Sequence, residues 1–197
     1  MSEEKTALNL LIDYAKQTGR EATYGVKDLS TFSTHHIFMH ARTIWFRDRQ
    51  NSERIFAAYS NPKVFGFQSV FSGVFIPTKA PKETVLMIRR KIFTDCLNAP
   101  FRPKISFNDK KLDRKLIVSG TVTNDNVDLL NNAKIHQALF DFTILNPSYR
   151  IVLNDLNMKW LPQFQNKSYL GLVRMGWETT QKIEDLFEHI KHFEMRQ

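Results

Sequence analysis

Apolar residues recur every three to four positions near both ends of the chain, which is the spacing of one helix face. The first set consists of Leu8, Leu11, Ile12 and Ala15. It predicts a helix over residues 3–18 that stops at Gly19. The second set consists of Ile183, Leu186, Phe187, Ile190 and Phe193. It predicts a final helix over residues 180–193.

Two internal segments also have helical spacing. One begins at Pro81, which suits the first turn of a helix, and must end before Pro100. Its apolar positions are Val85, Ile88, Ile92 and Cys96. The other covers residues 124–146, with an Asn or Asp as its cap and Asn-Pro at its end. Its apolar side consists of Val127, Leu130, Ile135, Ala138, Leu139 and Phe142.

Runs of β-branched and aromatic residues predict the strands. Residues 36–60 contain two such runs with a polar break between them, which favours a hairpin, with a helix over residues 36–46 as the alternative. Residues 20–33 are polar and aperiodic, which predicts a loop. The other expected strands are 65–77, 105–107 and 115–122 around a turn at 108–114, a hairpin of 150–153 with 158–161, and 169–175.

Helices alternating with hairpins predict an α+β fold, with about four helices packed on a mostly antiparallel sheet. A length of 197 residues favours a single domain over residues 1–197, with two small domains as the alternative.

The segment from Lys79 to Lys115 carries most of the net charge. It holds eleven Lys or Arg and four acids, which leaves +7 in a chain whose total is +8. Nine of these basic residues form the expected contact face: Arg89, Arg90, Lys91, Arg102, Lys104, Lys110, Lys111, Arg114 and Lys115.

Such a basic segment is typical of nucleic-acid binding, because each neutralised phosphate releases counterions. Phe93, Phe101 and Phe107 interleave with the charges, and aromatic rings stack on unpaired bases. An acidic protein or an anionic lipid is the next candidate partner. The competing interpretation is a solvated surface without a partner, because residues 89–91 on a helix would point in three directions. No known RNA-binding signature, zinc finger or helix-turn-helix is recognisable.

Four rings fall on one side of the expected strand 65–77: Phe65, Phe67, Phe71 and Phe75. Rings at this spacing are typical of a core. The alternative is an apolar pocket lined by these rings, with His36 or Asp141 as a polar group. That alternative predicts a small-ligand-binding protein or an enzyme without a recognisable motif.

Catalysis and metal binding have little support in the sequence. The chain lacks a Walker loop and the G-x-G-x-x-G fingerprint, and G-x-S-x-G is not satisfied around Ser69 or Ser72. The pairs His36/His40 and His189/His192 lack an evident third ligand. Neither a metal nor a cofactor is therefore expected.

Compartment and assembly are inferred from weaker signals. The single cysteine, Cys96, excludes an intramolecular disulfide and favours a reducing compartment. The first residues are acidic and no apolar run approaches the length of a membrane span, so a cytoplasmic location is expected. A homo-oligomer could form through the strand with Trp45 or an edge near Tyr169. The sequence thus predicts a cytoplasmic, non-catalytic binding module, with nucleic acid or an acidic protein as its partner.

Overall fold

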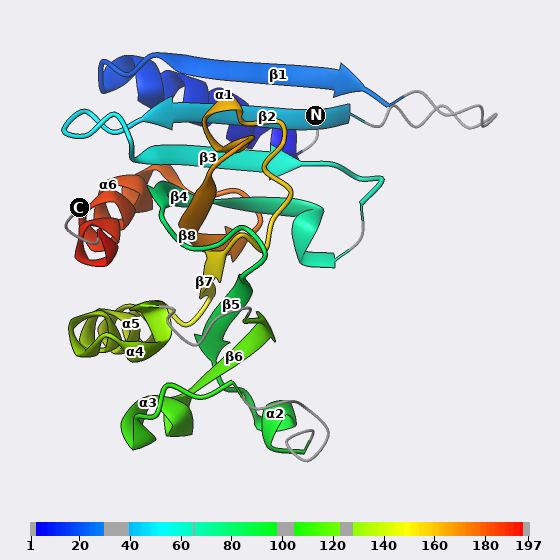
Figure 1. Ribbon diagram of the computed structural model, residues 1–197. Coiled ribbons are helices and arrows are strands. Elements are labelled where there is room, and N and C mark those ends of the chain that lie inside the picture. The colour runs from blue at the N-terminus through cyan, green and yellow to red at the C-terminus, as the bar shows by residue number, and fades with distance from the viewer. Residues whose placement is uncertain (1–2, 30–39, 65, 98–104, 123–127, 195–197) are drawn as a thin grey trace. The chain divides into compact units, whose positions relative to one another are not determined.

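The computed structural model describes residues 3–29, 40–64, 66–97, 105–122 and 128–194 (Figure 1). The chain divides into two compact units. Unit 1 consists of Met1–Ile76 with Val173–Glu188, and unit 2 consists of Pro77–Leu172 with His189–Gln197. The single domain expected from the sequence stays a prediction.

Unit 1 contains a sheet of antiparallel hairpins. Its helices are α1 (Glu3–Gln17), the 3-10 turn η1 (Gly66–Gln68) and most of α6 (Thr180–Ile190). Its strands are hydrogen-bonded in the order β1 (Ala22–Asp28), β2 (His40–Arg47), β3 (Ile55–Ser60), β4 (Val70–Thr78) and the end of β8 (Ser168–Met175). In the antiparallel register, Ile44 of β2 lies opposite Tyr24 of β1 and Ala58 of β3.

Aromatic rings fill the core of unit 1. Phe46 and Phe56 lie opposite each other on β2 and β3, and their rings stack with centroids 4.9 Å apart. Both side chains are completely buried. The apolar face of α1 covers β1 and β2 in Figure 1, with Leu11 and Ala15 buried. Burial of these rings stabilises the unit.

Unit 2 combines strands with shorter helices. Its strands are hydrogen-bonded in the order β8 (its first residues), β7 (Tyr149–Leu153), β5 (Val85–Arg90) and β6 (Leu116–Thr121). The helical elements are α2 (Phe93–Leu97), α3 (Lys110–Lys115), α4 (Asp128–Asn131), α5 (Ala133–Leu145), and the 3-10 turns η3 (Pro162–Phe164) and η4 (Lys191–Phe193). Ile88 at the centre of β5 lies opposite Val118 of β6 and Ile151 of β7.

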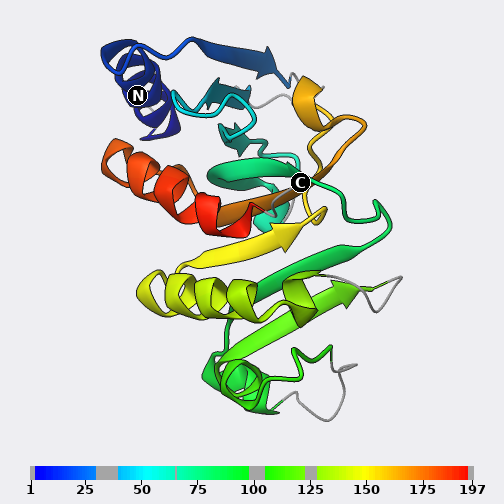
Figure 2. The ribbon, with the colours of Figure 1, turned by 60° about the vertical axis from the view of Figure 1, so that its left-hand side comes forward.

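The two faces of the β5–β6–β7 sheet differ in character. Helix α5 lies against one face of this sheet (Figure 2), and Leu86 and Ile88 of β5 are completely buried. Met87 and Arg89 alternate with them and are half-buried on the opposite face. Helix α3 lies on the same side of the sheet as α5, next to β6 (Figures 1 and 2). This arrangement brings the basic residues of α3 close to α5.

The α+β fold class is confirmed, and every strand pair with a given register is antiparallel. The two terminal helices and the hairpin within residues 40–60 are also confirmed, and residues 40–46 are strand rather than helix. In the part of the chain that the structure describes, no helix combines the length and apolar character needed to cross a membrane.

The helix predicted from Pro81 is wrong. Residues 85–90 form β5, and only residues 93–97 are helical. Val85 and Ile88 match helical spacing, but the buried positions Leu86 and Ile88 alternate with period two, and the β-branched content favours a strand. Pro81 instead accepts a hydrogen bond in a turn, from the amide of Thr84.

Other predicted boundaries also need correction. The loop over 20–33 contains β1, a short strand in which Ala22, Tyr24 and Val26 alternate with Thr23, Gly25 and Lys27. Tyr24 and Val26 are exposed, so this alternation does not mark a core-facing strand. The strand expected from Phe65 begins at Val70, because residues 66–68 form a 3-10 turn that Gly66 enters with φ of 77°. Residues 158–161 are not a strand, residues 105–107 contribute one isolated bridge from Ile105, and the helix expected over 124–146 is interrupted at Asn132.

The strands suggested for self-association are not sheet edges. The strand with Trp45 is β2, which pairs with β1 on one side and β3 on the other. Tyr169 belongs to β8, which lies between β4 and β7 in the strand order. Neither strand therefore offers unpaired backbone groups to a second chain.

Candidate functional site

The most basic part of the predicted contact face is helix α3, in a segment for which the sequence predicted only a turn. Asp109 is its N-cap, and its carboxylate accepts hydrogen bonds from the amides of Lys111 (2.8 Å) and Leu112 (3.2 Å). Leu112 is completely buried and anchors the helix on the protein. The prediction of a turn was wrong because Asp109 also suits a turn, and six residues with one apolar side chain give no helical period.

The acidic and carbonyl groups of α3 hold the helix in place. The Asp113 carboxylate accepts the amide of Phe107 at 2.9 Å and the hydroxyl of Ser106 at 2.7 Å. Lys91 donates its Nζ to the carbonyl of Asp113 and its backbone amide to the carbonyl of Lys115. Lys91 therefore serves the structure, and Asp113 is engaged away from the basic side chains.

Four exposed cations project from this short helix: Lys110, Lys111, Arg114 and Lys115. Within the described residues none of the four has a carboxylate partner. Lys110 with Arg114 and Lys111 with Lys115 are four positions apart, so each pair lies one above the other on the helix. Like charges at this spacing repel each other, which an anion would relieve.

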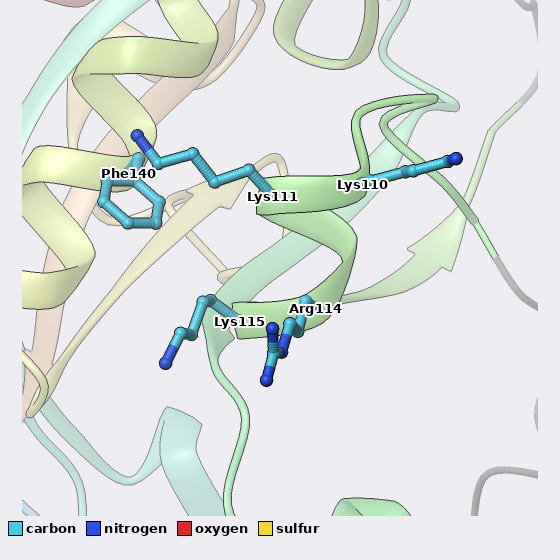
Figure 3. A pocket seen from close by; sticks show the side chains of 5 residues that line it. All are labelled: Lys110, Lys111, Arg114, Lys115 and Phe140. Atoms are coloured by element: carbon cyan, nitrogen blue, oxygen red, sulfur yellow. The ribbon is translucent and has the colours of Figure 1, made fainter.

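These four residues and Phe140 of α5 line a hollow of about 450 Å³, called the α3 hollow from here on (Figure 3). The Nζ of Lys111 lies 4.0 Å from the centre of the Phe140 ring, as a cation–π contact. Figure 3 shows Lys111 extending towards Phe140, Arg114 and Lys115 projecting from the last turn, and Lys110 pointing away from the ring. The hollow therefore presents positive charge beside an aromatic surface.

The remaining basic residues of the contact face do not all join this hollow. Arg89 forms a bidentate pair with Asp95, at 2.6 and 2.7 Å, on the opposite face of the sheet. Burial, and then the charge of Arg89, lower the pKa of the nearby Arg150. Arg90 is exposed and lies opposite Leu116, directly after α3. Arg102 and Lys104 lie outside the described residues.

The aromatic residue at the hollow was not among those singled out in the sequence. Phe107 is buried and packs edge-on against His136, and Phe101 lies outside the described residues. Phe93 is 80% exposed but does not line the hollow. Phe140 was detectable as an aromatic residue off the buried stripe of α5, but nothing in the sequence indicated that α5 and α3 are neighbours.

The predicted Phe-lined pocket has a different environment. Phe71 and Phe75 are completely buried, and their ring centroids lie 6.4 Å apart in an edge-to-face contact. Phe71 also stacks on Tyr59 at 5.4 Å. Phe67 is half-buried in η1, off the line of β4, and Phe65 lies outside the described residues. Phe67, Phe71 and Phe75 do not line the α3 hollow.

The other candidate polar groups are engaged or lie elsewhere. Asp141, a candidate polar group of the Phe-lined pocket, is exposed and accepts two hydrogen bonds from Gln137. His189 packs edge-on against Phe142. His36 and the side chain of Cys96 lie outside the described parts. Among the residues that are described, no group of three His, Cys, Asp or Glu side chains could hold a metal ion.

No protein-family model, curated protein or solved structure matches this chain. Its function is therefore inferred from the residues themselves.

Proposed function

We propose that this protein is a non-catalytic binding module that contacts nucleic acid through the α3 hollow. The observation that supports the proposal is the set of four exposed cations on one short helix, which have no carboxylate partner in the described parts and line one hollow together with the Phe140 ring. An acidic protein is the second partner considered. Arg90, which lies next to the end of α3, extends the same basic region.

Phosphate binding follows from the electrostatics of α3. Four like charges within one and a half helical turns raise the free energy of the unbound helix, because neighbouring pairs repel. A polyanion removes this repulsion and releases its own counterions on binding. The acids of α3 do not compete for these cations, because Asp109 caps the helix and Asp113 binds residues 106 and 107.

A binding role fits the lining of the hollow better than a catalytic one. The lining consists of four cations and a phenyl ring, without a carboxylate, imidazole or thiol. His136, the nearest imidazole on α5, uses its Nε2 on the carbonyl of Leu130 at 2.9 Å. General acid–base chemistry needs an acid and a base that converge on one point, and the residues that line the hollow are all cationic or apolar.

The proposal places the protein in a reducing compartment such as the cytoplasm, on the basis of its single cysteine. Self-association is kept as a prediction without an assigned strand.

Fluorescence anisotropy tests the proposal with labelled oligonucleotides of about ten nucleotides, a length within the usual site size. For single strands, each phosphate contact adds about 0.7 to the slope with which the logarithm of the affinity falls against the logarithm of the salt concentration. Four contacts therefore predict that a rise from about 50 to about 200 mM salt weakens binding roughly fiftyfold. A variant with Lys110, Lys111, Arg114 and Lys115 all changed to Gln should lose nearly all of this salt dependence.

The matched control removes charge outside the hollow. Lys159→Gln with Lys167→Gln changes two exposed lysines of unit 2 that do not line the hollow. Its salt dependence should equal that of the wild type.

The variant Lys111→Gln with Lys115→Gln removes the same charge from the hollow. It should halve the slope of log affinity against log salt. Equal losses in both double variants would mean that net charge alone governs binding. No binding at low salt would exclude nucleic acid, and binding to an acidic polypeptide instead would support the second partner.

A further inference from the structure

The ring of Phe140 gives the α3 hollow an aromatic surface, which phosphate binding by cations does not require. We infer that the hollow takes a single-stranded stretch of nucleic acid, with one base stacked on Phe140 and the adjacent phosphates on α3. The inference rests on the proposed function and names the form of nucleic acid that the same site binds.

Phe140 is held so that its ring borders the hollow. The buried stripe of α5 consists of Ile135, Leu139 and Phe142, which pack towards the sheet. Phe140 lies off this stripe and is half-buried, with its ring under the ammonium of Lys111. A helix of thirteen residues supports it, so the ring is positioned before a ligand arrives.

The contact between Lys111 and Phe140 can be exchanged for two stronger ones. In the structure the ammonium lies over the ring, and no carboxylate in the described parts binds it. A bound nucleotide offers a phosphate to the ammonium and a base to the ring. Stacking on an aromatic side chain strengthens binding by about tenfold or more for each base. An exposed cation–π contact is weaker than this, so the exchange favours the bound state.

The size of the hollow and the form of the ring favour an unpaired base over a duplex. The hollow, of about 450 Å³, is open to solvent and has room for one unpaired base. In a duplex the faces of the bases are already stacked, so only phosphates would reach α3. An acidic polypeptide can neutralise the cations, but its carboxylates do not stack on the ring.

The test compares three labelled ligands of equal length and identical sequence where bases are present: a single strand, the same strand made of abasic sites, and the blunt duplex. The wild type should bind the base-containing strand about tenfold more tightly than the abasic strand. Phe140→Leu should remove this difference, since leucine keeps an apolar side chain on α5 without a π face. Phe140→Trp should restore it.

The outcomes separate this inference from the proposed function. Equal affinity of the wild type for the base-containing and abasic strands would overturn the stacking inference, while the salt-dependent binding to α3 would stand. Preference for the duplex over the single strand would overturn it as well. No binding to any of the three ligands at low salt would overturn the proposed function itself. The comparison of ligands uses the unmodified protein, so it does not depend on how the variants fold.

Discussion

Arg20 and the cations of α3 occupy opposite environments. The Arg20 side chain is 2% exposed and forms an ion pair with Glu184 of α6, with nitrogen–oxygen distances of 2.8 and 2.9 Å. Its guanidinium lies 5.4–5.9 Å from the centres of three rings, those of Tyr14, Phe46 and Phe187. The α3 cations are exposed. Within the described residues, Lys111 lies over the Phe140 ring and none of the four cations has a carboxylate partner.

The contrast distinguishes a cation with a structural role from cations available to a partner. Burying a charge is costly, so Arg20 persists only because Glu184 and the rings compensate for its lost hydration. An exposed like-charged cluster has no such compensation within the described protein, and its repulsion is relieved by an external anion. Net charge counts both kinds of cation equally, which is why charge alone identifies a site poorly.

The largest expected effect comes from removing the buried cation. Arg20→Ala should lower the free energy of unfolding by about 3 kcal/mol, because it removes a buried side chain that packs against three rings as well as the ion pair with the exposed Glu184. Urea unfolding measures the change. Lys111→Ala, which removes an exposed cation of α3, should change stability by less than about 0.5 kcal/mol. Equal losses in the two variants would contradict the distinction.

Two adjacent arginines repeat the comparison inside the basic segment. Arg89→Ala should destabilise the protein by about 2 kcal/mol, because the Asp95 carboxylate, 3% exposed, loses its bidentate partner. Arg90→Ala should be nearly neutral for stability, since this side chain is exposed. Nucleic-acid binding should show the reverse order, with Arg90 the more important residue. Thermal unfolding measures the stability of both variants, and fluorescence anisotropy measures their affinity for nucleic acid. If the same substitution had the larger effect on stability and on affinity, the structural role of Arg89 and the binding role of Arg90 would be contradicted.

The cap of α3 tests geometry against net charge. Asp109→Ala removes a negative charge but also the side chain that caps the helix, with a loss of about 1 kcal/mol in stability. Fraying would separate the four cations, so binding should weaken although the protein becomes more positive. Glu83→Ala removes an exposed acid of the same segment and should leave binding unchanged or slightly tighter. Fluorescence anisotropy on both variants measures their affinity for nucleic acid. Tighter binding by Asp109→Ala would mean that net charge, and not the geometry of α3, governs the affinity.

The sequence predicted the elements whose pattern is both long and regular. The stripe Ile183, Leu186 and Phe187 identified α6, and the apolar runs flanking residues 47–53 identified the β2–β3 hairpin. It failed where one pattern fits two structures. Val85, Ile88 and Ile92 match helical spacing, yet hydrogen bonding to β6 and β7 makes residues 85–90 a strand. Such tertiary pairing overrides local spacing in short apolar runs.

The candidate site was predictable only in part for a related reason. Lys110, Lys111, Arg114 and Lys115 were identified from charge, and the structure places these four around one hollow. Their separation from Arg89 follows from strand alternation and the pair with Asp95, which the expected helix concealed. Phe140 is 25 positions beyond Lys115, and only the packing of α3 beside α5 brings the two together. A long-range contact of this kind has no local signal in a single sequence.

The smallest expected effect is the pH dependence of the Arg20 cluster. Burial raises the pKa of Glu184, but hydrogen bonds from Arg20 and Tyr14 and the charges of Arg20 and Arg49 outweigh burial, so the pKa lies below its ordinary value of 4.5. The unfolded chain then binds more protons than the native protein at acidic pH, and stability falls as the pH drops through 4.5 towards the native pKa. Urea midpoints of the wild type and Glu184→Gln from about pH 6 to about pH 3 isolate this contribution from other carboxylates. The advantage of the wild type over the variant should shrink towards acidic pH, whereas an advantage that stays constant would mean that Glu184 acts through hydrogen bonds that glutamine also makes. Phe140 and the α3 cations contribute no carboxylate to this range, so Lys111→Gln should leave the pH profile unchanged.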